Sequence, residues 1–219
     1  MSDTRTADKS APFLTDAALR LADLLSTPQS FVLTTHEGAD GDGLGSELAL
    51  ARVLRRRGSR VTIVNPGPTA RRFQFLDRDA DIHVYRSEHA ALIREADVAL
   101  LVDTGELRRA GVVGEVFGTR AGTVLAIDHH PKNGRSVDGL VGPDYSSTGE
   151  LVTALLRRLG WEVQPDVAEP LFAAILFDTQ QFRFVRNDPA AFEAATFLVA
   201  CGADAERVGK RLFGTVTRD

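Results

Sequence analysis

The chain has 219 residues, 43% of them hydrophobic, which is enough to fill the core of one generous domain or two small ones. Its formal net charge of −4 and pI near 5.8 argue against a protein that holds long duplex nucleic acid by neutralising phosphates. The single cysteine, Cys201, excludes an intrachain disulfide and a cysteine-built zinc site. Since the sequence shows neither an apolar run of membrane-spanning length nor a signal-peptide pattern, we expect a cytoplasmic protein without membrane contact.

The first part of the chain predicts a βαβ unit behind a disordered lead-in. Residues 1–12 are polar and without periodicity, and they are predicted to be disordered. Apolar residues at 14, 18, 21 and 25 then form one face of a helix with Thr15 as its N-cap. A β-branched run at 31–35 predicts a strand, and apolar positions 44, 48, 51 and 54 predict a helix. Gly58 is a fitting end for that helix, and a second strand is expected at 60–65.

The segment between the first strand and its helix, residues 36–46, is rich in chemistry. It places His36, Asp40 and Asp42 on one loop. Its glycines allow tight turns and a close approach of the backbone to a ligand, and the start of the next helix adds N–H groups and partial positive charge. The segment is therefore predicted to hold a metal ion with a phosphate beside it, with Gly45 and Ser46 as candidate phosphate contacts.

Further elements are expected downstream: a short helical stretch at 71–76, strands at 82–85, 97–102 and 123–127, and a helix at 90–94. The run at 97–102 is nearly all apolar, as in a central parallel strand, and it ends on Asp103. The run at 123–127 ends on Asp128, His129 and His130. In open α/β sheets ligands bind beyond the carboxyl ends of the strands, so these residues are expected to meet the 36–46 loop in one crevice.

The last third of the chain is predicted to be helical, with segments at 151–159, 167–177, 189–199 and 204–212. Ser147 and Glu150 form a capping-box pattern before the first of these. The second leads to Asp178, and Pro170 is expected to mark the start of its regular part. The predicted fold class is α/β, a three-layer sandwich with a mostly parallel central sheet, ending in a short helix.

Convergence of these segments would gather five aspartates and three histidines: Asp40, Asp42, Asp103, Asp128, Asp178, His36, His129 and His130. Five carboxylates within a few ångströms cannot all stay ionised without compensating cations. Oxygen-rich ligation with about one imidazole per ion suits two divalent ions, Mn²⁺ first, with Mg²⁺, Co²⁺ or Zn²⁺ as alternatives. Such a pair lowers the pKa of a water molecule and clamps a phosphoryl group, which predicts hydrolysis of a phosphoester or phosphoanhydride.

Each motif taken alone also has a plainer interpretation. An isolated Asp-Gly-Asp is usually only a turn, and strands that end in Asp-Thr-Gly are common. His83 and His89 lie outside the clusters and are predicted to be exposed or packing residues, and the phenylalanines at 172, 177, 192 and 197 are predicted to be core. The order of the four acidic elements, three of them at strand ends, favours a site over coincidence.

These residues resemble the motifs of the DHH phosphoesterases, in the order of that family: His36-x-x-x-Asp40-Gly-Asp42, Asp103-Thr104-Gly105, Asp128-His129-His130 and Asp178-Thr179. Within the family the chain is most similar to the nanoRNase/pAp-phosphatase branch, through residues 146–150, 177–184 and 187–189. The resemblance covers about residues 20–213. It implies a metal-dependent enzyme that hydrolyses short oligoribonucleotides, 3′-phosphoadenosine-5′-phosphate, or both, by a metal-activated water.

The resemblance also implies roles for individual residues. The first metal would be held by His36, Asp40 and Asp103, and the second by Asp42, Asp103, His129 and Asp178, with Asp103 bridging. His130 would contact the substrate phosphate, and Asp128 would orient a ligand histidine. Ser147 and Arg183 are further candidate substrate contacts.

The same resemblance divides the chain into a catalytic domain over residues 13–200 and a linker-like helical segment over 201–219. In this family a second domain with a glycine-rich motif binds the substrate, and no such motif is present here. The expected partners are a short RNA or nucleotide substrate and either a second copy of the chain or a separate C-terminal substrate-binding domain. Alternative functions are an inorganic pyrophosphatase, a cyclic-dinucleotide phosphodiesterase, or a non-catalytic nucleotide-binding subunit.

Overall fold

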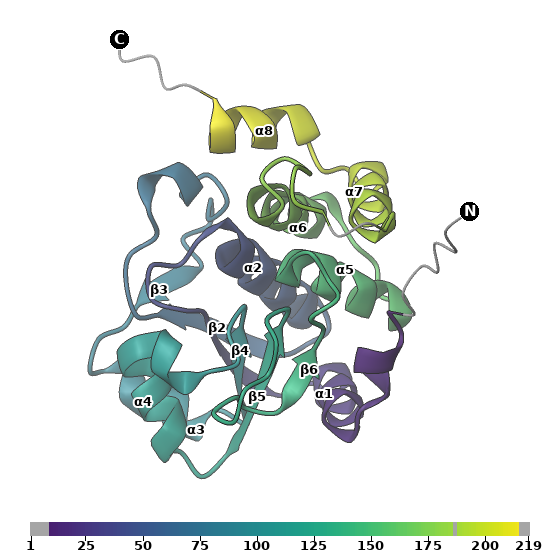
Figure 1. The fold of residues 1–219 in the computed structure, drawn as a ribbon. Coiled ribbons are helices and arrows are strands. Elements are labelled where there is room, and N and C mark those ends of the chain that lie inside the picture. Colours follow the sequence, from purple (N-terminus) through teal and green to yellow (C-terminus); the bar gives the residue numbers. More distant parts are fainter. Residues whose placement is uncertain (1–8, 186–187, 215–219) are drawn as a thin grey trace.

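The structure, a computed structural model, describes residues 9–185 and 188–214. Within them six parallel strands form one sheet in the order β3-β2-β1-β4-β5-β6 (Figure 1). The strands are β1 Ser30–Thr34, β2 Arg60–Asn65, β3 Ile82–Val84, β4 Val98–Val102, β5 Thr123–Asp128 and β6 Gly139–Val141. The predicted α/β class with a mostly parallel sheet is confirmed.

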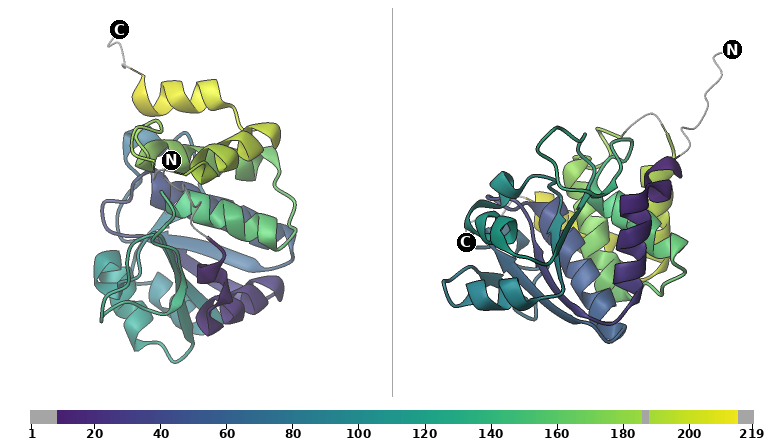
Figure 2. Two further views of the ribbon diagram at one scale, coloured as in Figure 1. Left: turned by 45° about the vertical axis from the view of Figure 1, so that its right-hand side comes forward. Right: turned by 90° about the horizontal axis from the view of Figure 1, so that it is seen from below.

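Helices cover both faces of the sheet (Figures 1 and 2). The α-helices are α1 Asp16–Ser26, α2 Gly41–Arg56, α3 His89–Glu95, α4 Gly111–Thr119, α5 Thr148–Arg158, α6 Pro165–Asp178, α7 Ala190–Ala200 and α8 Ala205–Phe213. The 3₁₀ helices among the described residues are η1 Ala11–Leu14, η2 Arg71–Phe73 and η3 Leu107–Ala110. One face of the sheet is covered by α3 and α4 and the other by α1, α2, α5 and α6, while α7 and α8 pack outside α6.

The strands divide their side chains between two apolar clusters because successive residues point to opposite faces. In β1, Phe31 and Leu33 enter the cluster under α2 and α6, whereas Val32 enters the one under α3 and α4. In β4 every residue is buried, as the continuous apolar run predicts for a central parallel strand. The sheet is thus held from both sides, and its carboxyl edge is a rigid platform for the loops that follow.

Helix α6 differs from the prediction, because it begins at Pro165 and runs through Pro170 without a break. Proline at the first helical position costs nothing, but Pro170 lacks the N–H that would bond the carbonyl of Asp166. That carbonyl accepts a hydrogen bond of 2.7 Å from the guanidinium of Arg52 on α2. A side chain from a neighbouring helix therefore satisfies the carbonyl that Pro170 frees, and the expectation that the regular helix starts at Pro170 is wrong.

The predicted disordered lead-in falls partly outside the described residues, which begin at Lys9. In its described part the structure differs from the prediction, because Lys9 forms ion pairs of 2.7 Å with Glu150 and 3.1 Å with Asp188. The η1 turn follows directly, and Phe13 is buried. Ion pairs with residues distant in sequence hold this segment on α5. The periodicity of the local sequence does not predict such pairs.

Two elements have no clear sequence signal. Helix α4, with the η3 turn before it, carries glycines at 111, 114 and 118, which weaken a helical pattern. Strand β6 is three residues long, and its first residue, Gly139, has φ of 157°. The backbone of Ala126 is so close to Gly139 that a Cβ would lie 1.9 Å from the carbonyl oxygen of Ala126.

None of the described helices is long and apolar enough to cross a membrane.

Candidate metal centre

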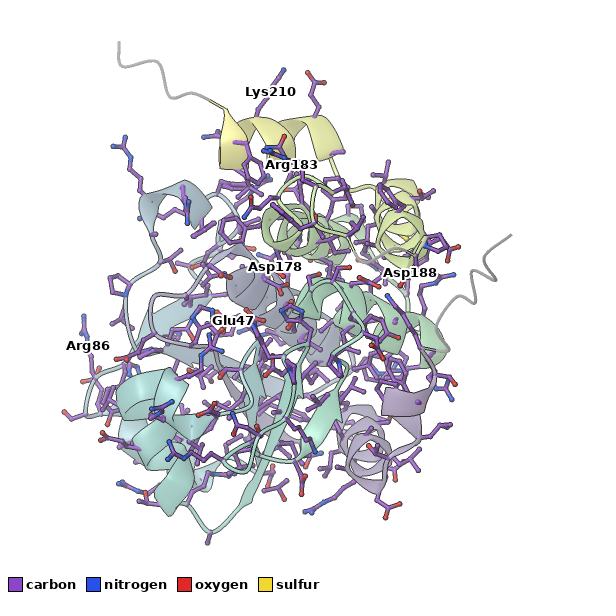
Figure 3. The ribbon with its side chains drawn as sticks, viewed as in Figure 1. Glu47, Arg86, Asp178, Arg183, Asp188 and Lys210 are labelled. Atoms are coloured by element: carbon purple, nitrogen blue, oxygen red, sulfur yellow. The ribbon has the colours of Figure 1, made fainter. Side chains whose placement is uncertain are left out.

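The carboxyl edge of the sheet gathers most of the predicted ligands. His36 follows β1, Asp103 follows β4, and His129 follows β5. Asp40 is the N-cap of α2, and Asp42 lies in its first turn. Asp178, the last residue of α6, joins them from the helical layer, near the middle of the molecule in Figure 3.

One group of candidate ligands consists of His36, Asp40 and Asp103. The Nε2 atom of His36 lies 3.5 Å from Oδ2 of Asp103 and 3.9 Å from Oδ2 of Asp40. The other carboxylate oxygen of Asp40 accepts hydrogen bonds from the N–H groups of Asp42 and Gly43. This N-cap orients Oδ2 of Asp40 toward His36.

A second group consists of Asp42, His129 and Asp178. Nε2 of His129 lies 3.5 Å from Oδ2 of Asp178, 3.8 Å from Oδ1 of Asp103 and 3.9 Å from Oδ2 of Asp42. Asp103 therefore presents one carboxylate oxygen to each group. Its two oxygens thus lie 3.5 Å from Nε2 of His36 and 3.8 Å from Nε2 of His129.

The donor set fits divalent cations. Ligand atoms at about 2.0–2.2 Å from one ion lie roughly 3 to 4.4 Å from one another, and the separations above fall in this range. Among the described residues, no lysine or arginine pairs with the aspartates at 40, 42, 103, 128 or 178, whose ion-pair partners are all histidines. The described part of the centre thus has no lysine or arginine to balance its carboxylates.

The pKa values of the cluster reflect this crowding. Burial, followed by the charges of Asp103 and Asp178, raises the pKa of Asp42 well above its usual value. Burial alone would raise the pKa of Asp103, but contacts with His36, His129 and Thr148 hold it below its usual value. The close approach of Asp103 also raises the pKa of His36 to about 9. Divalent cations would allow all these carboxylates to ionise together.

The N-terminus of α5 supports two of the aspartates. Asp42 is fully buried, and its carboxylate accepts hydrogen bonds from the N–H groups of Thr148 (2.7 Å) and Gly149 (2.8 Å). The hydroxyl of Thr148 donates to Oδ1 of Asp103 at 2.8 Å. Asp103 itself has φ of 61°, a left-handed conformation of the kind that clusters at functional sites. The sequence reasoning did not assign Thr148 a role, although the capping pattern around Ser147 marks the helix start that places it.

The two adjacent histidines are held differently. Nδ1 of His129 lies 3.3 Å from the carbonyl oxygen of Tyr145, which directs Nε2 to the carboxylates. Asp128 accepts from the N–H of His130 and lies 2.8 Å from its Nδ1. The histidine that Asp128 orients is therefore His130, the predicted phosphate contact, and not the predicted ligand His129. The bond to Asp128 also raises the pKa of His130.

The predicted substrate contacts near α2 and α5 are buried in the structure. Gly45 and Ser46 are buried inside α2, and a Cβ on Gly45 would lie 2.3 Å from the carbonyl oxygen of Pro170. The N–H groups of Asp42, Gly43 and Leu44 at the start of α2 are bound to Asp40. Ser147 is fully buried and caps α5 through the N–H of Glu150. Gly45 and Ser147 therefore serve packing and capping.

Arg183 is different, because its side chain is exposed. Figure 3 draws it between Asp178 and Lys210. The loop that carries it has three consecutive residues at positive φ, Gln180, Gln181 and Phe182. This strained turn follows directly on the metal-ligand candidate Asp178.

The predicted core residue Phe192 stacks on Phe182 with ring centroids 5.1 Å apart, yet its side chain is 48% exposed, so the prediction that Phe192 lies in the core is wrong.

The sequence analysis did not identify a buried carboxylic acid behind the centre. Glu47 on α2 is fully buried, and its Oε1 accepts from the amide of Asn65. The amide oxygen of Asn65 accepts in turn from the N–H of Thr35, the residue before His36. Burial raises the pKa of Glu47 well above its usual value. An acidic residue at a helical core position is the one signal that could have revealed it.

Comparison with known proteins points in one direction. The model of the DHH family, N-terminal domain, matches residues 30–175. The chain is 31% identical over 181 residues to the bifunctional oligoribonuclease and PAP phosphatase NrnA of Thermus thermophilus, covering 82% of this chain and 52% of that protein. It is 27% identical over 212 residues to the cyclic-di-AMP phosphodiesterase GdpP of Bacillus subtilis, covering 90% of this chain and 31% of that protein.

Among solved structures, an exopolyphosphatase-related protein from Bacteroides fragilis superposes with a TM-score of 0.84 at 24% identity, covering 91% of this chain and 60% of that one. This likeness concerns the fold. The chain spans about half the length of the curated NrnA relatives that it matches.

Proposed function

The chain belongs to the DHH family, and on that basis we propose that it is a two-metal phosphoesterase that hydrolyses short oligoribonucleotides, 3′-phosphoadenosine-5′-phosphate, or both. The observation that carries the proposal is the position of Asp103, which belongs to the group of His36 and Asp40 and directs its other carboxylate oxygen to His129 of the second group. A carboxylate between two such groups is suited to hold two ions close together, as in two-metal phosphoesterases.

In this proposal His36, Asp40 and Asp103 hold one divalent ion, and Asp42, Asp103, His129 and Asp178 hold the other. The donor set of carboxylates with one imidazole per ion favours Mn²⁺. Two such ions, when bound, lower the pKa of a water molecule and stabilise charge on the phosphoryl group.

Side chains of the protein would bind the substrate phosphate and hold the metal ligands in place. His130 is 44% exposed at the edge of the centre, and Asp128 fixes its ring and favours its charged form. A positive imidazole there would bind a phosphate oxygen of the substrate. Thr148 and the N–H groups of α5 hold Asp42 and Asp103 in place, so the ligands are organised before the substrate arrives.

The test is a hydrolysis assay with Mn²⁺ and either a labelled diribonucleotide or 3′-phosphoadenosine-5′-phosphate. We expect turnover by the wild type, and loss of at least about two orders of magnitude in Asp103→Asn, since both ligand groups lose a charge. Asp138→Asn is the matched control, because the side chain of Asp138 is 80% exposed and, among the described residues, pairs with Lys132 alone. Turnover that Asp103→Asn leaves unchanged would contradict the proposal.

A second candidate is a cyclic-dinucleotide phosphodiesterase, which the similarity to the GdpP protein favours. The same assay with cyclic-di-AMP separates the two, because a cyclic substrate cleaved much faster than a linear dinucleotide would point to it. Phosphate release from pyrophosphate would indicate a pyrophosphatase. Nucleotide binding without any turnover would indicate a non-catalytic subunit.

A further inference from the structure

A groove of about 960 Å³ lies between η2 and α8. We call it the basic groove; its lining residues include six cations, Arg71, Arg72, Arg78, Arg207, Lys210 and Arg211. Lys210 marks its α8 side in Figure 3. This volume is at the upper end of the range for small-molecule sites.

Among the residues that the structure describes, no carboxylate lines the basic groove, although the full sequence has a formal net charge of −4. Arg78 and Arg207 pair with Glu169. Lys210 pairs with Glu206 on the exposed side of α8. Among the described residues, Arg71, Arg72 and Arg211 have no acidic partner within 4.0 Å. The groove therefore carries uncompensated positive charge that a polyanion would neutralise.

The basic groove adjoins the metal centre through one aromatic ring. The guanidinium of Arg72 lies 5.1 Å from the ring centroid of Phe177. On another side this ring packs against Gly41, where a Cβ would lie 2.7 Å from Cγ of Phe177. Gly41 stands between Asp40 and Asp42, and Phe177 precedes Asp178. A chain of phosphates that leaves the centre past Phe177 would meet Arg72 and then the groove.

We propose that the basic groove binds the phosphate backbone of a single-stranded oligonucleotide whose scissile phosphodiester lies at the metal centre. The inference rests on the proposed function for its substrate class. A nucleic acid is favoured over other polyanions because the half-buried ring of Phe75 also lines the groove, and bases stack on aromatic rings. The substrate is then read as a strand of several nucleotides and not only as one phosphodiester.

The test measures binding without turnover. Fluorescence anisotropy of a fluorescein-labelled hexauridylate is recorded in EDTA with the wild type and with the double variant Arg71→Glu/Arg211→Glu. Both side chains are exposed, so the fold is expected to persist, and circular dichroism checks it. The control Arg86→Glu reverses one charge on an exposed side chain away from the groove, at the left edge of the molecule in Figure 3.

We expect the double variant to bind the hexanucleotide more weakly and Arg86→Glu to bind it as the wild type does. Two lost phosphate contacts reduce the slope of log Kd against log salt by about 1.4, at roughly 0.7 per contact on a single strand. Between 50 and 200 mM salt, wild-type binding should therefore weaken about sevenfold more than binding by the double variant. A dinucleotide, too short to reach the groove, should show no such difference.

Equal affinity and equal salt slopes for the wild type and the double variant would overturn the inference. It would also be overturned if hexaglutamate displaced the RNA as well as unlabelled hexauridylate does, or if a linear polyphosphate of equal length bound more tightly than the RNA. Hydrolysis of the dinucleotide with Mn²⁺ is followed separately in the same variants. Its absence in the wild type would count against the proposed function, whereas the groove is judged by binding alone.

Discussion

Replacing Glu47 with glutamine should change how stability depends on pH. The carboxyl group of Glu47 has no exposed surface, and its Oε2 has no hydrogen-bond partner among the described residues. Burial therefore raises its pKa well above the usual value of 4.5, while Asn65 offers only one opposing hydrogen bond. Glutamine keeps the shape and the acceptor for Asn65 but removes the titrating group.

The sign follows from proton binding. Below pH 4.5 the acid is protonated in both the folded and the unfolded chain, so it adds no pH dependence. Above that value the unfolded chain loses the proton while the folded chain keeps it, and the free energy of unfolding falls by about 1.4 kcal/mol per pH unit until the folded-state pKa is reached. Glu47→Gln lacks this loss, so its stability relative to the wild type should rise with pH.

The assay is urea unfolding of the wild type and Glu47→Gln from pH 4.5 to 7.5 in EDTA. Other groups titrate alike in both proteins, so the difference between the two curves isolates Glu47. Glu115→Gln is the control, because Glu115 is exposed on α4. Parallel curves for the wild type and Glu47→Gln across this range would refute the reasoning, since they would mean that the buried acid ionises as freely as it does in the unfolded chain.

Three further predictions concern the centre and its support. Thr148→Val should weaken Mn²⁺ binding about 10- to 100-fold by calorimetry, because it removes the hydroxyl that donates a hydrogen bond to Asp103. Thr148→Ser keeps a hydroxyl and should not weaken binding. Equal losses of affinity in the two variants would contradict the supporting role of this hydroxyl. Gly45→Ala should lower stability by about 1–3 kcal/mol in urea because its methyl group meets Pro170, while Gly209→Ala, with open space around it, should be neutral or stabilising. Adding Mn²⁺ at about 100 times its Kd should raise the free energy of unfolding by about 3 kcal/mol, and EDTA should reverse this; an unchanged melting temperature would argue against a metal centre.

Local patterns in the sequence were enough for most of the fold. Strand β2 spans the predicted residues 60–65, because a β-branched run between two turns has one stable local interpretation. The N-caps at Thr15 and Ser147 are confirmed, since a cap is decided by residues within one turn. The structure also places the acidic ends of β4 and β5 together with the 36–46 loop, as parallel strands require.

Tertiary packing decided how those residues work. The carboxylate of Asp42 is held by the N-terminus of α5, 106 residues along the chain, and Gly45 is needed because the backbone of α6 lies against it. The basic groove combines cations of η2 and α8, which are distant in sequence. The periodicity and capping patterns of the sequence predict only which face of an element a residue lies on and where the element ends. The packing of α2, α5, α6 and α8 decides which elements are in contact and which charges are buried away from water. Local sequence patterns do not show this packing.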